Sequence, residues 1–148
     1  CNASTHMISP AQFEQWALEP CKRVSDVLKD AGAIVFLHNS EEQVAGLRLQ
    51  ALTEPNVLSV GPGLDMAVAL KELDGQIPLM GNLDPIEMLT NASASQVAGE
   101  TDRLVRMMAD GGMILNSGEC IPREAKPPNM HTMIDTGRKV WGLVQGRR

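Results

Sequence analysis

Residues 77–85 read IPLMGNLDP, and this stretch decides the fold. Its first four residues form a short apolar run, which is typical of a strand buried on both faces of a parallel sheet. The remainder is a polar exit, in which Asn82 and Asp84 favour a structured loop and Pro85 favours the first turn of a helix. The stretch therefore predicts a strand that leads through a polar loop directly into a helix.

Three further segments repeat this strand–loop–helix pattern. Short apolar runs at 33–37, 57–60 and 113–115 predict strands. A first helix is predicted over 9–31, kinked or divided by Pro20. Later helices are predicted over about 40–53, 65–73, 85–89, 95–109 and 129–142. Alternating strands and helices form parallel sheets with right-handed crossovers, so we expect an α/β fold with its strands in sequential order.

The composition is that of a globular domain and disfavours several classes of partner. The chain has 148 residues, of which 43% are hydrophobic and 21% are charged. Its net charge of −5 argues against binding to nucleic acid or to an acidic membrane surface. No apolar run reaches the ~18 residues of a membrane span. Three widely spaced cysteines do not suggest a disulfide scaffold, and they favour a reducing, cytoplasmic setting.

Polar side chains follow the predicted strands, at the end of the sheet where parallel α/β proteins bind ligands. His38 follows the first strand, and Glu119 and Cys120 follow the fourth. Imidazole, carboxylate and thiolate are zinc ligands, and zinc would hold a substrate thiol as the nucleophilic thiolate. His38 is therefore a metal ligand or general base, or alternatively a loop histidine. Glu119 and Cys120 are likewise metal ligands or, alternatively, surface residues.

The other polar positions carry weaker signals. Asn82 and Asp84 either touch a ligand or only shape their loop. The run Gly61-Pro62-Gly63 lacks the third glycine of a dinucleotide-binding fingerprint and predicts a tight turn. His6 lies in a polar N-terminal stretch and has no functional signal.

Six segments agree in order and spacing with those of one known family: 9–14, 36–38, 57–60, 77–85, 112–118 and 127–129. They resemble the C-terminal half of the uroporphyrinogen decarboxylase family. The resemblance implies a barrel of eight βα units with its active site at the carboxyl ends of the strands. Residues 1–148 would then be one half barrel, a fragment in which 9–31 is the helix preceding the first strand. A start at Cys1 fits a piece of a longer protein, and a cloning remnant is the alternative.

The resemblance implies one of two chemistries. Decarboxylases of the family remove acetate carboxyls from uroporphyrinogen without a cofactor, and they carry a histidine in a Gly-His-Gly turn where this chain has Glu119. Methyltransferases of corrinoid systems bind zinc through a His-x-Cys pattern after the fifth strand and a cysteine after the eighth. Here His38 matches, Ser40 replaces the first cysteine, and Glu119 replaces the second, with Cys120 beside it. The exit of the sixth strand, usually acidic in the family, is Gly61, with Asp65 nearby.

The favoured function is therefore a zinc-dependent methyl transfer between a small methylated substrate and a corrinoid protein. His38, Glu119 and Cys120 are the expected metal ligands. Glu119 and Asp84 are the expected catalytic residues, and Asn82 is the expected cofactor-binding residue. The alternatives are uroporphyrinogen decarboxylation in porphyrin biosynthesis, which needs no cofactor, and a half barrel that is inactive alone.

The open edges of a half barrel also predict an association. Unpaired strand edges expose backbone N–H and C=O groups and favour pairing with another chain. The expected partner is the missing N-terminal half barrel or a second copy of this chain, in addition to the small-molecule substrate and the corrinoid protein.

Overall fold

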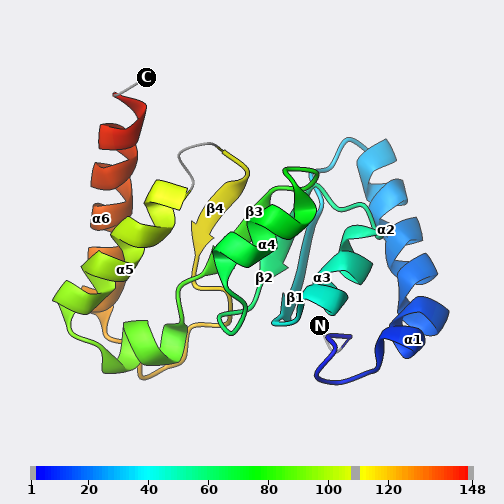
Figure 1. Ribbon diagram of the computed structural model, residues 1–148, viewed down its shortest axis with the longest axis horizontal. Coiled ribbons are helices and arrows are strands. Elements are labelled where there is room, and N and C mark those ends of the chain that lie inside the picture. The colour runs from blue at the N-terminus through cyan, green and yellow to red at the C-terminus, as the bar shows by residue number, and fades with distance from the viewer. Residues whose placement is uncertain (1–2, 108–110, 147–148) are drawn as a thin grey trace.

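The computed structural model describes residues 3–107 and 111–146 (Figure 1). In chain order its elements are α1 (Pro10–Phe13), the π-helix η1 (Glu14–Leu18), α2 (Glu19–Asp30), β1 (Phe36–Glu41), α3 (Val44–Ala51), β2 (Val57–Val60), α4 (Met66–Leu73), β3 (Leu79–Asn82), the π-helix η2 (Pro85–Asn91), α5 (Ala94–Met107), β4 (Met113–Asn116) and α6 (Pro127–Gln145). Every described helix is too short or too polar to span a membrane.

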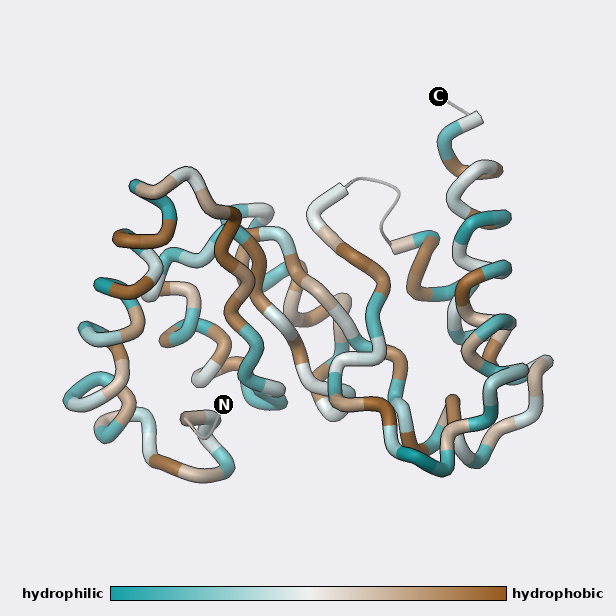
Figure 2. The backbone as a smooth tube through the Cα atoms, turned by 180° about the vertical axis from the view of Figure 1, so that it is seen from behind, coloured by the Kyte–Doolittle hydropathy of each residue, from teal (hydrophilic) through white to brown (hydrophobic). Residues whose placement is uncertain are grey.

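The four strands form one parallel sheet in the order β1-β2-β3-β4, which confirms the predicted α/β topology. Leu79 of β3 is aligned with Leu58 of β2 on one side and with Met113 of β4 on the other. Helices α3 and α4 cover one face of the sheet, whereas α2 and α6 stand beside its two edges (Figure 1). Seen from behind, the strands have no helix in front of them (Figure 2).

The core lies between the sheet and its covering helices, and it is aliphatic. Its side chains are almost fully excluded from solvent because leucines of the strands meet leucines of the helices and loops. The largest of them are Leu47, Leu58, Met66, Leu79, Leu83, Leu89 and Leu104. Burial of such side chains stabilises the fold by about 1.5–3 kcal/mol each.

The N-terminal helix is divided near Pro20, as its sequence predicts. Ser9 and Gln12 form a reciprocal capping box that starts α1. The helix then widens into the π-turn η1, and Pro20 lies in the first turn of α2. The backbone stays right-handed helical through Leu18 and Glu19. Proline has no backbone N–H, so the hydrogen-bonding pattern changes in the turn that would have accepted its bond.

The first strand begins later than predicted. The expected strand at 33–37, buried on both faces, is wrong in its bounds and in its burial. Ile34 is 72% exposed, and the Val35 N–H donates to Asn56 Oδ1 rather than to a neighbouring strand. β1 is an edge strand, so its first residues lack the covering layer that a central strand has. As a result His38 lies within β1 instead of after it.

The helix predicted from about residue 40 also begins later, at Val44. Ser40 has a φ of 45°, and Glu41 is aligned with Val60 in the sheet. The parallel register shifts between Leu37 and Glu41, which marks a bulge in β1. The segment 38–40 therefore belongs to a distorted strand that projects side chains at its carboxyl end.

Candidate functional site

A cavity of about 550 Å³ opens at the carboxyl ends of β1 and β4. It is lined by Ser4, His6, Met7, His38, Asn39, Ser40, Glu42, Glu119 and Cys120. The structure thus brings together the three residues expected as metal ligands, although they come from opposite ends of the chain. It adds an N-terminal segment whose residues had no functional signal in the sequence.

His38 is held by a neighbouring strand. Its Nδ1 lies 3.0 Å from Oγ of Ser59, a completely buried residue of β2. Its Nε2 lies 4.0 Å from Oε1 of Glu119 and 3.5 Å from Oγ of Ser40. Because Ser59 fixes one ring nitrogen, the other nitrogen is directed toward Glu119.

Gly61 permits the bulge that positions His38. Its N–H donates to the Glu41 carbonyl at 2.9 Å, and a Cβ at this position would lie 2.7 Å from the Ser40 carbonyl oxygen. Any side chain at residue 61 would collide with the bulged backbone of β1. Asp65 does not supply the acidic group that the resemblance implies there, because its Oδ1 accepts from the N–H groups of Ala67 and Val68 and caps α4.

Glu119 is presented by a tight turn after β4. The Asn116 side chain accepts from the Gly118 N–H at 2.9 Å, and the Ser117 hydroxyl donates to the Glu119 carbonyl at 2.7 Å. Gly118 has a φ of 76°, and a Cβ there would lie 2.9 Å from the Val60 carbonyl oxygen. Only glycine fits this conformation and this close approach. The turn therefore packs against β2 and places the Glu119 carboxylate opposite His38.

The residues of this cavity do not assemble a zinc set. Nowhere in the described part of the chain do three His, Cys, Asp or Glu side chains come close enough to hold one metal ion. His38 and Glu119 approach each other, and Cys120 lines the same cavity, but Ser40 offers a hydroxyl where the resemblance implies a thiolate. Because protein zinc sites use at least three protein ligands, the arrangement does not fit a resident zinc ion.

Asn82 and Asp84 lie at the carboxyl end of β3 but line a different cavity of about 320 Å³. The Asn82 side-chain amide donates to the carbonyls of Gly61 and Leu64, at 3.0 and 2.6 Å. The Asp84 carboxylate accepts from two backbone N–H groups and caps η2. Both side chains thus have structural partners, and the structure does not bring them into the cavity of His38.

The N-terminal segment reaches the cavity through Glu41 and Glu42. Thr5 donates its backbone N–H and its hydroxyl to the Glu41 carboxylate, at 2.9 and 2.6 Å. His6 Nε2 lies 3.2 Å from Glu42 Oε2. Sequence reasoning missed His6 and Glu41, because His6 had no functional signal and the segment from about residue 40 predicted the start of a helix. The adjacent acidic pair after a strand was the only signal that pointed to them.

Known proteins resemble the chain over nearly its whole length. The sequence profile of the uroporphyrinogen decarboxylase (URO-D) family matches residues 1–140. The uroporphyrinogen decarboxylase of Ruegeria pomeroyi is 31% identical over 131 residues, which is 86% of this chain and 37% of that protein. The methylcobamide:CoM methyltransferase MtbA of Methanosarcina mazei is 26% identical over 137 residues, covering 92% of this chain and 39% of that protein.

The fold agrees with these relatives. A solved methyltransferase from Methanosarcina mazei superposes with a TM-score of 0.82 at 18% identity, over 94% of this chain and 40% of that one. The chain therefore spans well under half the length of the proteins it matches, and its four βα units correspond to part of a TIM barrel. On the match over residues 1–140, the chain belongs to the uroporphyrinogen decarboxylase family.

Proposed function

We propose that this chain contributes to an enzyme that transfers a methyl group between a small methylated substrate and a corrinoid protein, in the cytoplasm. The observation that carries the proposal is the approach of Glu119 to His38, at 4.0 Å, across the mouth of the sheet. The decarboxylases that the chain resembles have a histidine where Glu119 stands. The chain resembles relatives of both activities. Glu119 in place of that histidine counts against decarboxylation, and this is the feature that favours methyl transfer.

The described side chains supply a positioned proton carrier. In the tautomer in which Nδ1 of His38 donates to Ser59, the Nε2 atom accepts a proton from a group in the cavity. Glu119 then faces the resulting imidazolium and stabilises it. The pair therefore takes a proton from the substrate, or returns one, at the position of Nε2. Zinc has no step in this proposal, because the donor set does not fit it.

We also propose that the chain completes its sheet with a partner half barrel, either an N-terminal half or a second copy. Apolar side chains are exposed on and beside both edge strands. Beside β1 these are Val24, Val27, Leu28, Ile34 and Phe36, and beside β4 they are Ile114, Ile134, Trp141 and Leu143. Burying apolar surface stabilises association by about 25 cal/mol per Å². Analytical ultracentrifugation of the purified chain tests this, because a stable, folded 16.0 kDa monomer would contradict it.

The methyl transfer is tested by two parallel assays. The chain is mixed with the N-terminal half barrel of the Methanosarcina mazei methyltransferase and with a small thiol or amine as the methyl acceptor, and transfer of the methyl group from methylcobalamin to this acceptor is followed by the cobalamin absorbance. Decarboxylation of uroporphyrinogen by the same mixture is followed by release of CO₂. We expect methyl transfer, with a loss of roughly 100-fold in His38→Gln, because acid–base groups contribute at least about that factor. The exposed loop variant Glu124→Gln is the control.

The opposite pattern contradicts the proposal. Decarboxylation without methyl transfer would assign the chain to the other activity of the family. Equal rates of methyl transfer by His38→Gln and by the control would show that His38 is not the proton carrier. Zinc bound at one equivalent and lost in Cys120→Ala would show that a metal belongs in the step.

A further inference from the structure

The turn Gly61-Pro62-Gly63 makes room for the side chain of Glu42. A Cβ on Gly61 would lie 2.8 Å from Cγ of Glu42, and a Cβ on Gly63 would lie 2.6 Å from its carboxyl carbon. Neither glycine has a positive φ, so space and not backbone conformation requires glycine at these two positions. The Gly63 N–H also donates to Glu42 Oε1 at 3.1 Å. The turn therefore holds the Glu42 carboxylate from one side.

The other oxygen of this carboxylate faces the N-terminal segment. Glu42 Oε2 lies 3.2 Å from His6 Nε2, and both side chains are partly exposed. His6 and its neighbour Met7 line the cavity that contains His38. The pair of His6 and Glu42 therefore holds one wall of that cavity.

The same segment has two attachments that do not involve His6. On one side Thr5 donates its backbone N–H and its hydroxyl to the completely buried carboxylate of Glu41. On the other side α1 is packed into the protein through Phe13, which is 2% exposed. Residues 6–8 lie between these attachments, so loosening the contact of His6 with Glu42 would free these residues alone.

The attachments differ in their response to pH. An imidazole changes its charge between about pH 5 and pH 8, whereas an ordinary carboxylate is ionised throughout that range. The hydroxyl and backbone N–H of Thr5 do not titrate there. The other ionisable side chains that line the cavity are His38, which faces Glu119, and Cys120.

We propose that residues 6–8 form a pH-sensitive wall of this cavity. Protonation of His6 turns its contact with Glu42 into an ion pair that holds the wall closed. When His6 is neutral, the wall loosens between Thr5 and α1, and the cavity opens on that side. Regulation of the reaction by this wall rests on the proposed function, whereas the movement of the wall is measured without any reaction.

Hydrogen exchange reports whether the wall is closed. The N–H groups of Met7 and Ile8 both donate to the Ser4 carbonyl, at 2.9 and 3.1 Å, so they exchange when this turn opens. Protection factors, which correct for the intrinsic exchange rate, are measured at about pH 5.5 and about pH 8, on the two sides of the ordinary histidine titration. We expect both amides to be roughly two- to fivefold better protected at the lower pH, as a partly exposed ion pair provides. The Thr5 amide, bonded to Glu41, should be equally protected at both.

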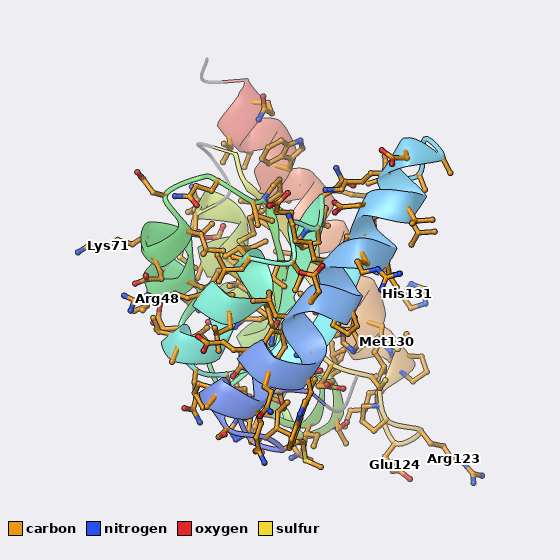
Figure 3. All side chains as sticks on the ribbon, turned by 90° about the vertical axis from the view of Figure 1, so that its right-hand side faces the viewer. Arg48, Lys71, Arg123, Glu124, Met130 and His131 are labelled. Atoms are coloured by element: carbon orange, nitrogen blue, oxygen red, sulfur yellow. The ribbon has the colours of Figure 1, made fainter. Side chains whose placement is uncertain are left out.

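Variants assign the pH dependence to the pair. Glu42→Gln should abolish it and lower the protection to the value of the parent chain at the higher pH. Gly63→Ala should do the same, because its Cβ displaces the Glu42 carboxylate. Glu124→Gln is the matched control, because Glu124 is exposed in the loop before α6 and projects away from the body of the protein (Figure 3). His38→Gln should retain the pH dependence, because His38 faces Glu119 instead.

Equal protection of Met7 and Ile8 at both pH values would overturn the inference. The same pH dependence in Glu42→Gln and Glu124→Gln would assign it to another group and would overturn it as well. Glu42→Gln decides the result if Gly63→Ala does not fold. A chain whose wall responds to pH as expected but that transfers no methyl group contradicts the proposed function alone. Methyl transfer by a chain whose wall does not respond contradicts this inference alone.

Discussion

Glu41 should be the most sensitive charged position of the fold. Its side chain is 0% exposed and accepts five hydrogen bonds. Oε1 accepts from the Thr5 hydroxyl and from the N–H groups of Glu42 and Gln43, whereas Oε2 accepts from the Thr5 N–H and the Gln50 amide. One carboxylate thereby joins the N-terminal segment, β1 and the start of α3.

The expected loss of stability in Glu41→Gln follows from counting the hydrogen-bond donors that lose their acceptor. An amide NH₂ in place of Oε2 faces two donors, the Thr5 N–H and the Gln50 amide. Gln50 has an unpartnered Oε1 among the described residues, so rotation of its amide turns that clash into a hydrogen bond. One buried N–H remains without an acceptor, which costs about 1–3 kcal/mol. Glu41→Ala leaves all the donors without an acceptor and should lower the free energy of unfolding by more than about 3 kcal/mol.

Urea unfolding followed by circular dichroism measures these losses, with Glu124→Gln as an exposed control. Hydrogen exchange at the Thr5 amide provides a local readout, because this N–H loses its acceptor in Glu41→Gln. We expect faster exchange there together with the global loss. A Glu41→Gln protein as stable as the control, with unchanged exchange at Thr5, would show that the five contacts do not hold the segment.

Two further predictions concern other positions. Gly46→Ala should destabilise the fold by about 1–3 kcal/mol, because the new Cβ would overlap the Glu41 carboxylate. Gly99→Ala should stabilise the fold by about 0.5–1 kcal/mol, because Gly99 lies on α5 with open space around it. Urea unfolding measures both changes. The hydrogen bond from Arg48 lowers the pKa of Glu72, so this carboxylate stabilises the fold above its unfolded pKa and loses that effect as the pH falls through its lowered value. Arg48→Met should raise the Glu72 pKa in a carbon-detected titration, and an unchanged titration would contradict the pairing.

The sheet was predictable from sequence because its central strands obey simple rules. The run at 57–60 lies between Asn56 and Gly61, and the run at 77–80 is followed by Gly81. Both faces of a central strand are covered, so a continuous apolar run identifies it. The edge strand β1 has a different sequence pattern, because only one of its sides is paired in the sheet. Its paired segment contains polar residues, and the apolar residues before it are exposed, so the apolar run marked the approach to the strand instead of the strand itself.

The candidate site was predictable only in part, for a related reason. Parallel topology brings the carboxyl ends of β1 and β4 to the same end of the sheet, which is sufficient to place His38 and Glu119 together. The strand order does not reveal which other segments of the chain pack against this end of the sheet. His6 enters the cavity through contacts between Thr5 and Glu41, and no periodicity or spacing encodes a contact across 36 residues of chain.

The bulge in β1 shapes the backbone at the mouth of the site. A regular strand alternates its side chains between the two faces of the sheet, so His38 and Ser40 would share one face and Asn39 would point to the other. The register shifts between Leu37 and Glu41 and Ser40 has a φ of 45°, so the strand bends where His38 and Ser40 line the cavity, while Asn39 stays buried. Gly61 makes this possible by leaving room for the Ser40 carbonyl. A substitution of Gly61 by any larger residue would therefore alter the site through the backbone of β1, with no contact between residue 61 and the ligand.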